Sequence, residues 1–187
     1  MHRIAIFASG SGSNAENIAL YFKDNPQIKI VAIFSDKPDA YVLKRAEKLN
    51  IPTYVFTMTD LKDENGVFKE LMMLNIDFIV LAGFLRLIPP HIISSYCNCI
   101  INIHPALLPK FGGKGMHGMH VHEMVKAAGE KETGITIHYV NEKYDEGAII
   151  FQDKVSVDQN DSPETIAAKV HELEYRHFPK IIEKLLG

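Results

Sequence analysis

The chain has 187 residues, of which 47% are hydrophobic and 23% are charged, and its formal net charge is −3. These values are typical of one globular domain with a sizeable core, spanning residues 1–187, and they argue against a nucleic-acid-binding surface. The first apolar segment, Ile4–Ala8, is too short for a signal peptide or a membrane span.

The two cysteines, Cys97 and Cys99, stand two residues apart and are expected on one strand. Such a pair cannot form an ordinary structural disulfide, and without two further ligands it makes a poor zinc site. We therefore expect reduced thiols and a cytoplasmic protein.

The first strand, Ile4–Ala8, runs into a glycine-rich loop, Ser9–Asn14, and then into a helix that ends near Asn25 and Pro26. Glycines let the backbone approach a phosphate closely, and the amides at the start of a helix point toward it. The third glycine of a dinucleotide fingerprint is absent, and no lysine follows as in a P-loop. The loop therefore predicts a site for a single phosphate, and a tight structural turn is the alternative.

Helical and strand periodicities alternate from residue 3 to residue 104. The expected strands are Lys29–Phe34, Thr53–Phe56 and Ile76–Ala82, and the expected helices are Tyr41–Leu49 and Asp60–Leu74, the latter with a weak point at Asn65 and Gly66. This alternation predicts an α/β fold with a doubly wound, mostly parallel sheet. Ligands bind such sheets at the carboxyl ends of the strands, where three loops fall: residues 9–14, 83–90 and 102–109.

Asn102 and His104 close the apolar strand that contains Ile100 and Ile101. Side chains two apart on a strand share a face, so these two project together, and Pro105 restricts His104 to an extended backbone. An amide donor beside a titratable ring suits a reaction that builds negative charge on oxygen. A histidine and an asparagine that cap a loop are the alternative.

The segment Gly83–Pro90 carries a single arginine, Arg86, among large apolar side chains. This combination suits a flat, partly apolar ligand with an anionic end. The alternative is a strand that ends at Gly83 and leads into a helix set by Pro89 and Pro90, with Arg86 in solvent.

The stretch Lys110–His122 is rich in glycine and histidine, a composition that suits a mobile lid, although the sequence does not decide whether it is one. We do not expect its histidines, His117, His120 and His122, to bind a metal, because only Glu123 could complete a ligand set. We expect one of them to line the site instead.

Two alternating segments, Thr133–Val140 and Ala148–Val157, predict a hairpin-like antiparallel element late in the chain. Asp145 lies in the polar connection between them. An aspartate in this position is most often a turn-former, and the functional alternative is that it orients and charges His104.

The end of the chain is predicted to be helical. Ser162 is placed as the N-cap and Pro163 as the first helical residue, and the helix continues through Thr165–Tyr175. Phe178 and Pro179 are predicted to bend the chain into a separate last helix that ends at residue 187.

Four motifs in this order and spacing resemble the folate-dependent formyltransferase family over essentially the whole chain. They are Ser9–Asn14, Leu81–Arg86, Asn102–Pro109 and Tyr144–Gly147. The resemblance implies transfer of the formyl group of 10-formyltetrahydrofolate to the glycyl amine of 5′-phosphoribosylglycinamide in de novo purine biosynthesis, through a tetrahedral intermediate. It also implies a phosphate-binding half in residues 1–100 and a catalytic and folate-binding half in residues 101–187.

The resemblance also assigns site residues. The implied catalytic residues are Asn102, His104 and Asp145. The implied contacts of the ribonucleotide are Gly12, Ser13, Asn14, His171, Glu172, Leu173 and Glu174. The implied contacts of the formyl folate are Leu85, Arg86, Leu87, Ile88, Asn102, Asn141, Glu142, Lys143, Tyr144 and Asp145. The chain departs from the family at one point, because where relatives use an arginine near the folate, Asp60–Gly66 offers only Lys62.

Two other functions stay open at this point. A formyltetrahydrofolate hydrolase or a methionyl-tRNA formyltransferase shares the catalytic trio, but the first is expected to need an extra amino-terminal domain and the second a basic carboxyl-terminal one. A phosphate- or nucleotide-binding module without turnover has no need of an oxyanion-stabilising pair. We expect small-molecule substrates, no metal, no nucleic acid, no membrane, and a monomer or weak homodimer.

Overall fold

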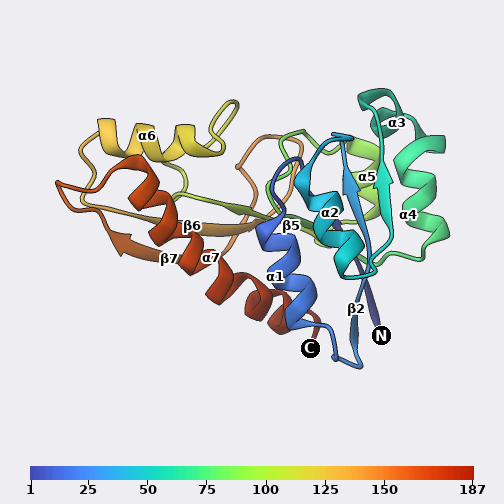
Figure 1. Cartoon of the computed structure of the whole chain (residues 1–187). Coiled ribbons are helices and arrows are strands. Elements are labelled where there is room, and N and C mark those ends of the chain that lie inside the picture. Colours follow the sequence, from blue (N-terminus) through green and yellow to red (C-terminus); the bar gives the residue numbers. More distant parts are fainter.

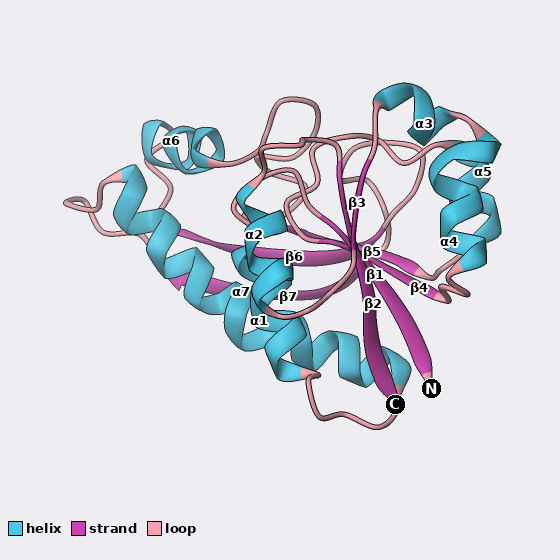
Figure 2. Ribbon diagram, turned by 45° about the vertical axis from the view of Figure 1, so that its right-hand side comes forward, coloured by secondary structure: helices cyan, strands magenta, loops and turns pink.

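The computed structural model describes residues 1–187 and contains one seven-stranded sheet in the order β3-β2-β1-β4-β5-β6-β7 (Figures 1 and 2). The strands are β1 (His2–Phe7), β2 (Ile28–Ser35), β3 (Thr53–Val55), β4 (Phe78–Leu81), β5 (Ile100–His104), β6 (Glu132–Tyr139) and β7 (Ile149–Ser156). Neighbouring strands from β3 to β5 are parallel, and β6 and β7 are antiparallel additions. The predicted fold class, a mostly parallel sheet with a late antiparallel element, is confirmed.

Helices cover both faces of the sheet. They are α1 (Ser13–Tyr21), α2 (Tyr41–Lys48), α3 (Met58–Lys62), the π-helical turn η1 (Glu64–Phe68), α4 (Lys69–Met73), α5 (Pro90–Ser95), α6 (Met119–Ala127) and α7 (Pro163–Leu186). One face packs against α1, α2 and α7, and the other against α3, η1, α4 and α5. Helix α6 packs on α7, away from the parallel strands (Figure 1).

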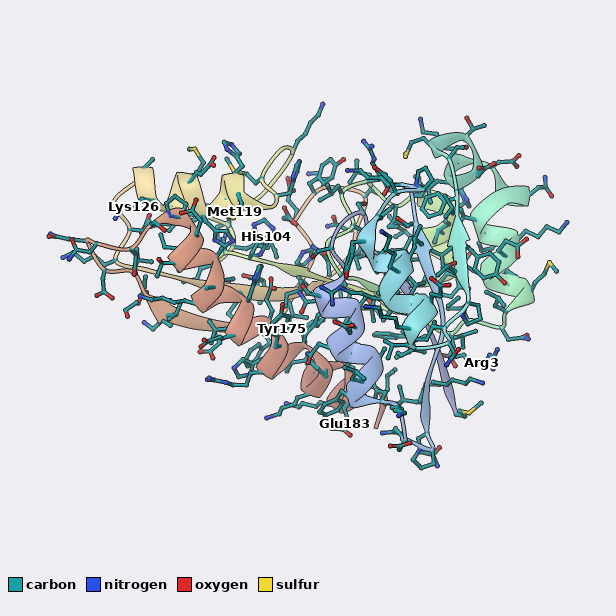
Figure 3. The ribbon with its side chains drawn as sticks, viewed as in Figure 1. Arg3, His104, Met119, Lys126, Tyr175 and Glu183 are labelled. Atoms are coloured by element: carbon teal, nitrogen blue, oxygen red, sulfur yellow. The ribbon has the colours of Figure 1, made fainter.

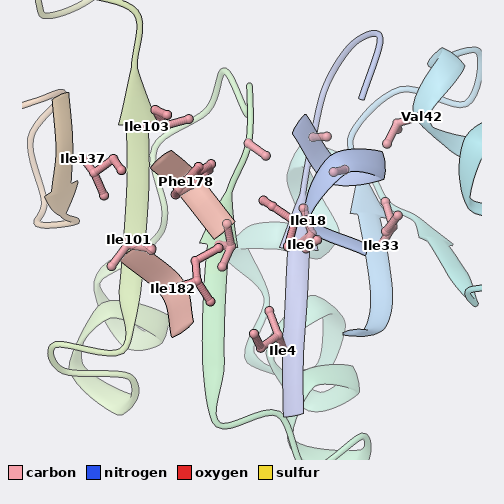
Figure 4. Packing of buried hydrophobic residues seen from close by; sticks show 14 of the residues in the cluster. Ile4, Ile6, Ile18, Ile33, Val42, Ile101, Ile103, Ile137, Phe178 and Ile182 are labelled. Carbon is pink, nitrogen blue, oxygen red and sulfur yellow. The ribbon is translucent and has the colours of Figure 1, made fainter. Parts of the chain in front are cut away.

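Alternation along β1 divides its side chains between two cores. Ile4 and Ile6 belong to the core on the α7 side, whereas Ala5 and Phe7 belong to the core on the α4 side. Figure 4 shows the first core, in which Phe178 of α7 packs beside the central strands. A strand buried on both faces needs apolar residues throughout, which is why the sequence there shows no polar alternation.

The helix predicted over residues 60–74 is broken into α3, η1 and α4. The break lies at Gly66, whose ψ is −119°, and a Cβ on this residue would stand 2.1 Å from the carbonyl oxygen of Asp60. Asp63 stops α3 with an extended backbone and accepts a hydrogen bond from the N–H of Asn65. The predicted weak point is therefore a true interruption of the helix.

The separate last helix predicted after Pro179 is wrong, because α7 runs unbroken through this residue. Proline has no N–H to donate, so the carbonyl of Tyr175, four residues earlier, loses its helical partner. The side-chain amide of Asn17 on α1 replaces it, donating to this carbonyl at 3.0 Å. A hydrogen bond between helices thus satisfies the group that the proline leaves free.

Two further predictions fail locally. Cys97 and Cys99 are not on a strand but in the turn between α5 and β5, where Asn98 has a positive φ of 55°; both are free thiols. Within the stretch Lys110–His122, residues from Met119 onward form helix α6, which the sequence analysis did not predict. Among the helices, none combines the length and apolarity that crossing a bilayer requires.

Candidate active site

A cavity of about 600 Å³ lies at the carboxyl edge of the sheet, where the strand order reverses between β1 and β4. Its walls come from the loops after β1, β4 and β5, from the segment before α6, and from α7. The volume suits a small-molecule ligand, and the position is the one expected for a doubly wound sheet. Figure 3 labels His104 close to Met119, the first residue of α6, and both line the cavity.

Most of the predicted site residues meet here. Those that line the large cavity are Gly12, Ser13, Asn14, Leu85, Arg86, Asn102, His104, Tyr144, Asp145, His171 and Glu174. A second cavity of about 50 Å³ is lined by Leu87, Ile88, Asn141 and Lys143, and it shares Arg86, Asn102, Tyr144 and Asp145 with the first. The two cavities are therefore neighbouring parts of one site.

Three of the assigned site residues line neither cavity, namely Glu142, Glu172 and Leu173, and Lys62 lines neither as well. On α7, positions three apart share a face, so His171 and Glu174 reach the cavity together. Glu172 is exposed, and Leu173 belongs to the hydrophobic core. Helix geometry thus separates two of the four consecutive residues from the site.

The glycine loop and α7 lie side by side in the wall of the large cavity. Gly12 has a φ of +72° and precedes α1, so the N–H groups of Ser13 and Asn14 lie in the first turn, where a helix offers them no acceptor. The side-chain amide of Asn14 donates to Glu174 Oε2 at 2.8 Å, and His171 Nε2 stands 4.0 Å from the same oxygen. Burial raises the pKa of Glu174, against the opposing effects of His171 and Asn14.

The sheet register brings the catalytic candidates together. On the antiparallel pair β5–β6, Asn102 stands opposite His138 and His104 stands opposite Thr136. Asp145, in the β6–β7 connection, reaches the same place: its Oδ2 lies 3.5 Å from His104 Nδ1, and its Oδ1 lies 3.5 Å from Asn102 Nδ2. The Asp145 side chain also accepts the N–H of Gly113 at 2.9 Å.

His138 is a member of this cluster that the sequence analysis missed. Its Nε2 lies 3.1 Å from Asn102 Nδ2 and 3.5 Å from Asp145 Oδ1, and its Nδ1 lies 2.8 Å from the carbonyl oxygen of Tyr139. A carbonyl only accepts, so Nδ1 carries a proton, and in the neutral ring Nε2 accepts from Asn102. His138 therefore fixes which way the Asn102 amide faces.

The charges of His104 and Asp145 are set by opposing effects. Burial lowers the pKa of His104, and it outweighs the Asp145 carboxylate and the Phe111 carbonyl, which both favour the charged ring. Burial alone would raise the pKa of Asp145, but the adjacent His138 side chain, the charge of His104 and the N–H of Gly113 hold it below its ordinary value. Asp145 is thus a carboxylate at neutral pH, beside a histidine whose burial resists charging.

Backbone carbonyls and polar side chains hold His104 and its loop in place. His104 Nε2 stands 2.7 Å from the carbonyl oxygen of Phe111, a residue with a positive φ of 54°. Thr136 accepts the N–H of Leu108 at 3.0 Å and donates to the carbonyl of Ala106 at 2.7 Å. The segment after β5 is therefore anchored on the neighbouring strand rather than free.

Arg86 is held by a carboxylate of its own protein. Its Nε donates to Asp36 Oδ2 at 2.9 Å, and the Asp36 side chain is only 2% exposed whereas that of Arg86 is 47% exposed. One edge of the guanidinium is thus occupied, and the other donors remain available to an anionic group. The sequence allowed either a ligand-binding or a solvent-exposed Arg86. In the structure this side chain is anchored by Asp36 and is still accessible to a ligand.

Because His122 on α6 is buried, we expect the protein to lose stability in acid. The residue is 2% exposed, its Nδ1 has no hydrogen-bond partner, and burial, followed by the charges of His171 and His104, lowers its pKa to about 4. An unfolded histidine titrates near 6.5, so the unfolded chain takes up this proton first as the pH falls. We expect the free energy of unfolding to drop by roughly 3 kcal/mol from this residue between pH 7 and pH 4.

Urea unfolding at a series of pH values checks this expectation. His122→Leu should flatten the pH dependence over that interval, because the replacement cannot titrate. His120→Leu on the same helix is the matched control, since the His120 side chain is 52% exposed, and it should leave the wild-type slope unchanged. Equal slopes for wild type and His122→Leu would contradict the assignment.

Comparisons with known proteins agree with this site. Residues 2–182 match the sequence profile of the family described as formyl transferase. The phosphoribosylglycinamide formyltransferase of Bacillus subtilis (strain 168) is 38% identical over 192 residues, covering 100% of this chain and 96% of its own. The crystal structure of the enzyme of that name from Brucella melitensis has a TM-score of 0.88 at 39% identity, covering 100% of this chain and 96% of the other. That from Streptococcus pneumoniae TIGR4 has a TM-score of 0.88 at 36% identity, with both chains fully covered.

Proposed function

The chain belongs to the formyl transferase family, and from this premise we propose that it transfers the formyl group of 10-formyltetrahydrofolate to the glycyl amine of 5′-phosphoribosylglycinamide in purine biosynthesis. The relatives described above carry the name of this activity and align with the chain over its whole length. The observation that carries the proposal is the meeting of Asn102, His104 and Asp145 in a cavity that the glycine loop also lines.

The ribonucleotide lies along the wall made by α1 and α7. Its phosphate sits at the glycine loop, where the free N–H groups of Ser13 and Asn14 match an anion. Glu174, held by Asn14 and flanked by His171, accepts hydrogen bonds from the neutral part of the substrate. This arrangement directs the glycyl amine toward His104.

The formyl folate occupies the wall made by the loops after β4 and β6. Leu87 and Ile88 offer apolar contact to a flat ring in the smaller cavity, and Arg86 keeps free donors for an anionic group. The backbone of residues 141–145 closes the other side of this cavity. In this chain Lys62 is exposed on α3 and lines neither cavity, so Arg86 is the cation that we assign to the folate side.

The reaction joins the glycyl nitrogen to the formyl carbon and moves the carbonyl electron pair onto oxygen. The N–H of His104 Nε2 leaves the Phe111 carbonyl and donates to that oxygen, and Asn102 contributes the N–H whose contact with Asp145 is long, at 3.5 Å. Asp145, a carboxylate, receives the proton that the amine loses, directly or through a water. The oxyanion then re-forms the carbonyl as the bond from carbon to the folate nitrogen breaks, and that nitrogen takes up the proton held by Asp145, directly or through a water.

Replacement of His138 by phenylalanine is expected to lower kcat by roughly tenfold to a hundredfold with little change in either KM. Phenylalanine keeps a planar aromatic ring but has no nitrogen, so Asn102 loses the acceptor that orients its amide, and a misdirected donor stabilises the oxyanion poorly. Steady-state kinetics measure the effect. Tyr139→Phe, one residue along β6, is the control and should behave like wild type, and an unchanged kcat in His138→Phe would remove this residue from the mechanism.

The direct test is a formyl-transfer assay with both purified substrates. Formylated ribonucleotide that forms only when both substrates are present supports the transferase. Deformylation of the folate without the ribonucleotide identifies a hydrolase instead. Binding of the ribonucleotide without any turnover leaves a binding module. The cytoplasmic location, the monomeric or weakly dimeric state and the division into residues 1–100 and 101–187 stay predictions.

A further inference from the structure

Helix α2 holds the glycine loop from behind, on the side away from the cavity. The N–H of Val42 donates to the carbonyl of Gly10 at 3.1 Å, and Arg45 Nε donates to the carbonyl of Ser11 at 2.9 Å. The Val42 side chain fills the space in front of Gly12, where a Cβ would stand 2.2 Å from its Cγ2. Two successive carbonyls of the loop thus point at α2.

The direction of these carbonyls decides where the N–H groups point. In a planar trans peptide the C=O and the following N–H point in opposite directions. With the Ser11 carbonyl turned to Arg45, the N–H of Gly12 is turned away from α2, toward the side on which Ser11, Gly12 and Ser13 line the cavity. The guanidinium of Arg45 therefore sets the orientation of one peptide group of the glycine loop, the one between Ser11 and Gly12.

Arg45 is itself well fixed. Its Nη1 forms an ion pair with Glu16 of α1, and its Cζ lies 5.0 Å from the centre of the Tyr41 ring. Because it binds Ser11 and Glu16 at once, it connects α2 to both the loop and the first turn of α1. Arg45 does not line the cavity, so it acts through the loop and not by touching a ligand.

We propose that Arg45 is a positioning residue for the substrate phosphate: it holds the Ser11–Gly12 peptide so that the Gly12 N–H faces the phosphate oxygens, and it places a positive charge behind the loop. This inference rests on the proposed function, because it assigns the glycine loop to the phosphate of the ribonucleotide. It adds a residue that neither the sequence motif nor the cavity lining includes.

The experiment compares substrates with and without the phosphate. Arg45→Met should raise the KM for the ribonucleotide by roughly tenfold to a hundredfold, as expected for a lost charge-assisted hydrogen bond, and leave kcat and the KM for the folate within about twofold. With the dephosphorylated substrate, glycinamide riboside, kcat/KM should be nearly equal for wild type and Arg45→Met. Lys44→Met, an exposed neighbour on α2, should behave like wild type with both substrates.

A second variant separates positioning from simple charge pairing. Arg45→Met leaves the Glu16 carboxylate without its partner near the phosphate, so the double variant with Glu16→Gln removes that repulsion. The double variant should retain most of the defect in KM. Full recovery of the wild-type KM would overturn the proposal, because it would show that Arg45 only neutralises Glu16. An equal loss of kcat/KM with and without the substrate phosphate would overturn it as well.

Failure of the proposed function itself gives a different pattern. If the wild-type protein transfers no formyl group, the role of Arg45 can still be tested by phosphate binding. Inorganic phosphate is titrated into the protein, and binding is monitored through the amide NMR signal of Gly12. Weaker phosphate binding in Arg45→Met and an intermediate value in Arg45→Lys support the positioning role. Equal phosphate binding in wild type and Arg45→Met overturns it.

Discussion

Replacing Asp145 with asparagine is expected to lower kcat by roughly 10²- to 10³-fold while the protein folds normally. Asparagine keeps the size of the side chain, and it tolerates the left-handed backbone that Asp145 adopts at a φ of 55°. It removes the carboxylate that faces Nδ1 of His104 and accepts the N–H of Gly113, and it directs an N–H at one of them. Charge is lost where the mechanism needs a proton acceptor.

The measurement is the formyl-transfer rate at saturating substrates, with the thermal unfolding midpoint as the check on folding. Glu146→Gln is the matched control, because this neighbouring carboxylate is 60% exposed and pairs only with Lys143. It should transfer the formyl group at the wild-type rate. Near-wild-type turnover in Asp145→Asn would show that the carboxylate has no role in the reaction.

Replacing His104 with alanine is expected to reduce kcat by about 10³-fold, because Nε2 is the donor closest to the developing oxyanion in the proposed mechanism. The ribonucleotide phosphate is bound elsewhere, by the glycine loop, so the affinity for the ribonucleotide should change little. The variant also loses the hydrogen bond to Phe111 and leaves a void in a buried position, so some stability is lost.

Calorimetric binding of the ribonucleotide to His104→Ala distinguishes lost chemistry from lost structure. Wild-type affinity together with a large drop in kcat is the expected result. His104→Gln keeps an N–H near the same place and should recover part of the rate. His120→Ala on the exposed face of α6 serves as the control, and a similar drop in that variant would mean that the assay reports general damage.

Local sequence patterns predicted the parallel sheet and one side of the site. Asn102 and His104 meet because alternate strand residues share a face, and the glycine loop lies beside them because parallel strands end at one edge. Both inferences use only neighbours in the chain and a rule about sheets. They required no knowledge of which distant segments touch.

The features that escaped prediction depend on contacts between distant segments. The sequence pattern around His138 indicates only an ordinary strand residue, because the register of β5 against β6 is what places it opposite Asn102. The continuation of α7 through Pro179 is supported by Asn17, more than 150 residues away in sequence, which donates to the carbonyl that the proline leaves free. Helix α6 begins after Gly118 with no side-chain cap and packs on α7, so its stability comes from tertiary contact and not from local signals.

The hydrogen bond between His104 and the Phe111 carbonyl has a consequence for selectivity among one-carbon folates. The protein supplies its own carbonyl oxygen to Nε2, so a bound formyl group exchanges one acceptor for another at little net cost. A methyl or methylene folate brings no oxygen to that nitrogen. Such a ligand offers His104 no acceptor in exchange for the Phe111 carbonyl, so the ring keeps its internal hydrogen bond. In the proposed mechanism, only an oxygen-bearing one-carbon unit can therefore take the Nε2 N–H from the Phe111 carbonyl.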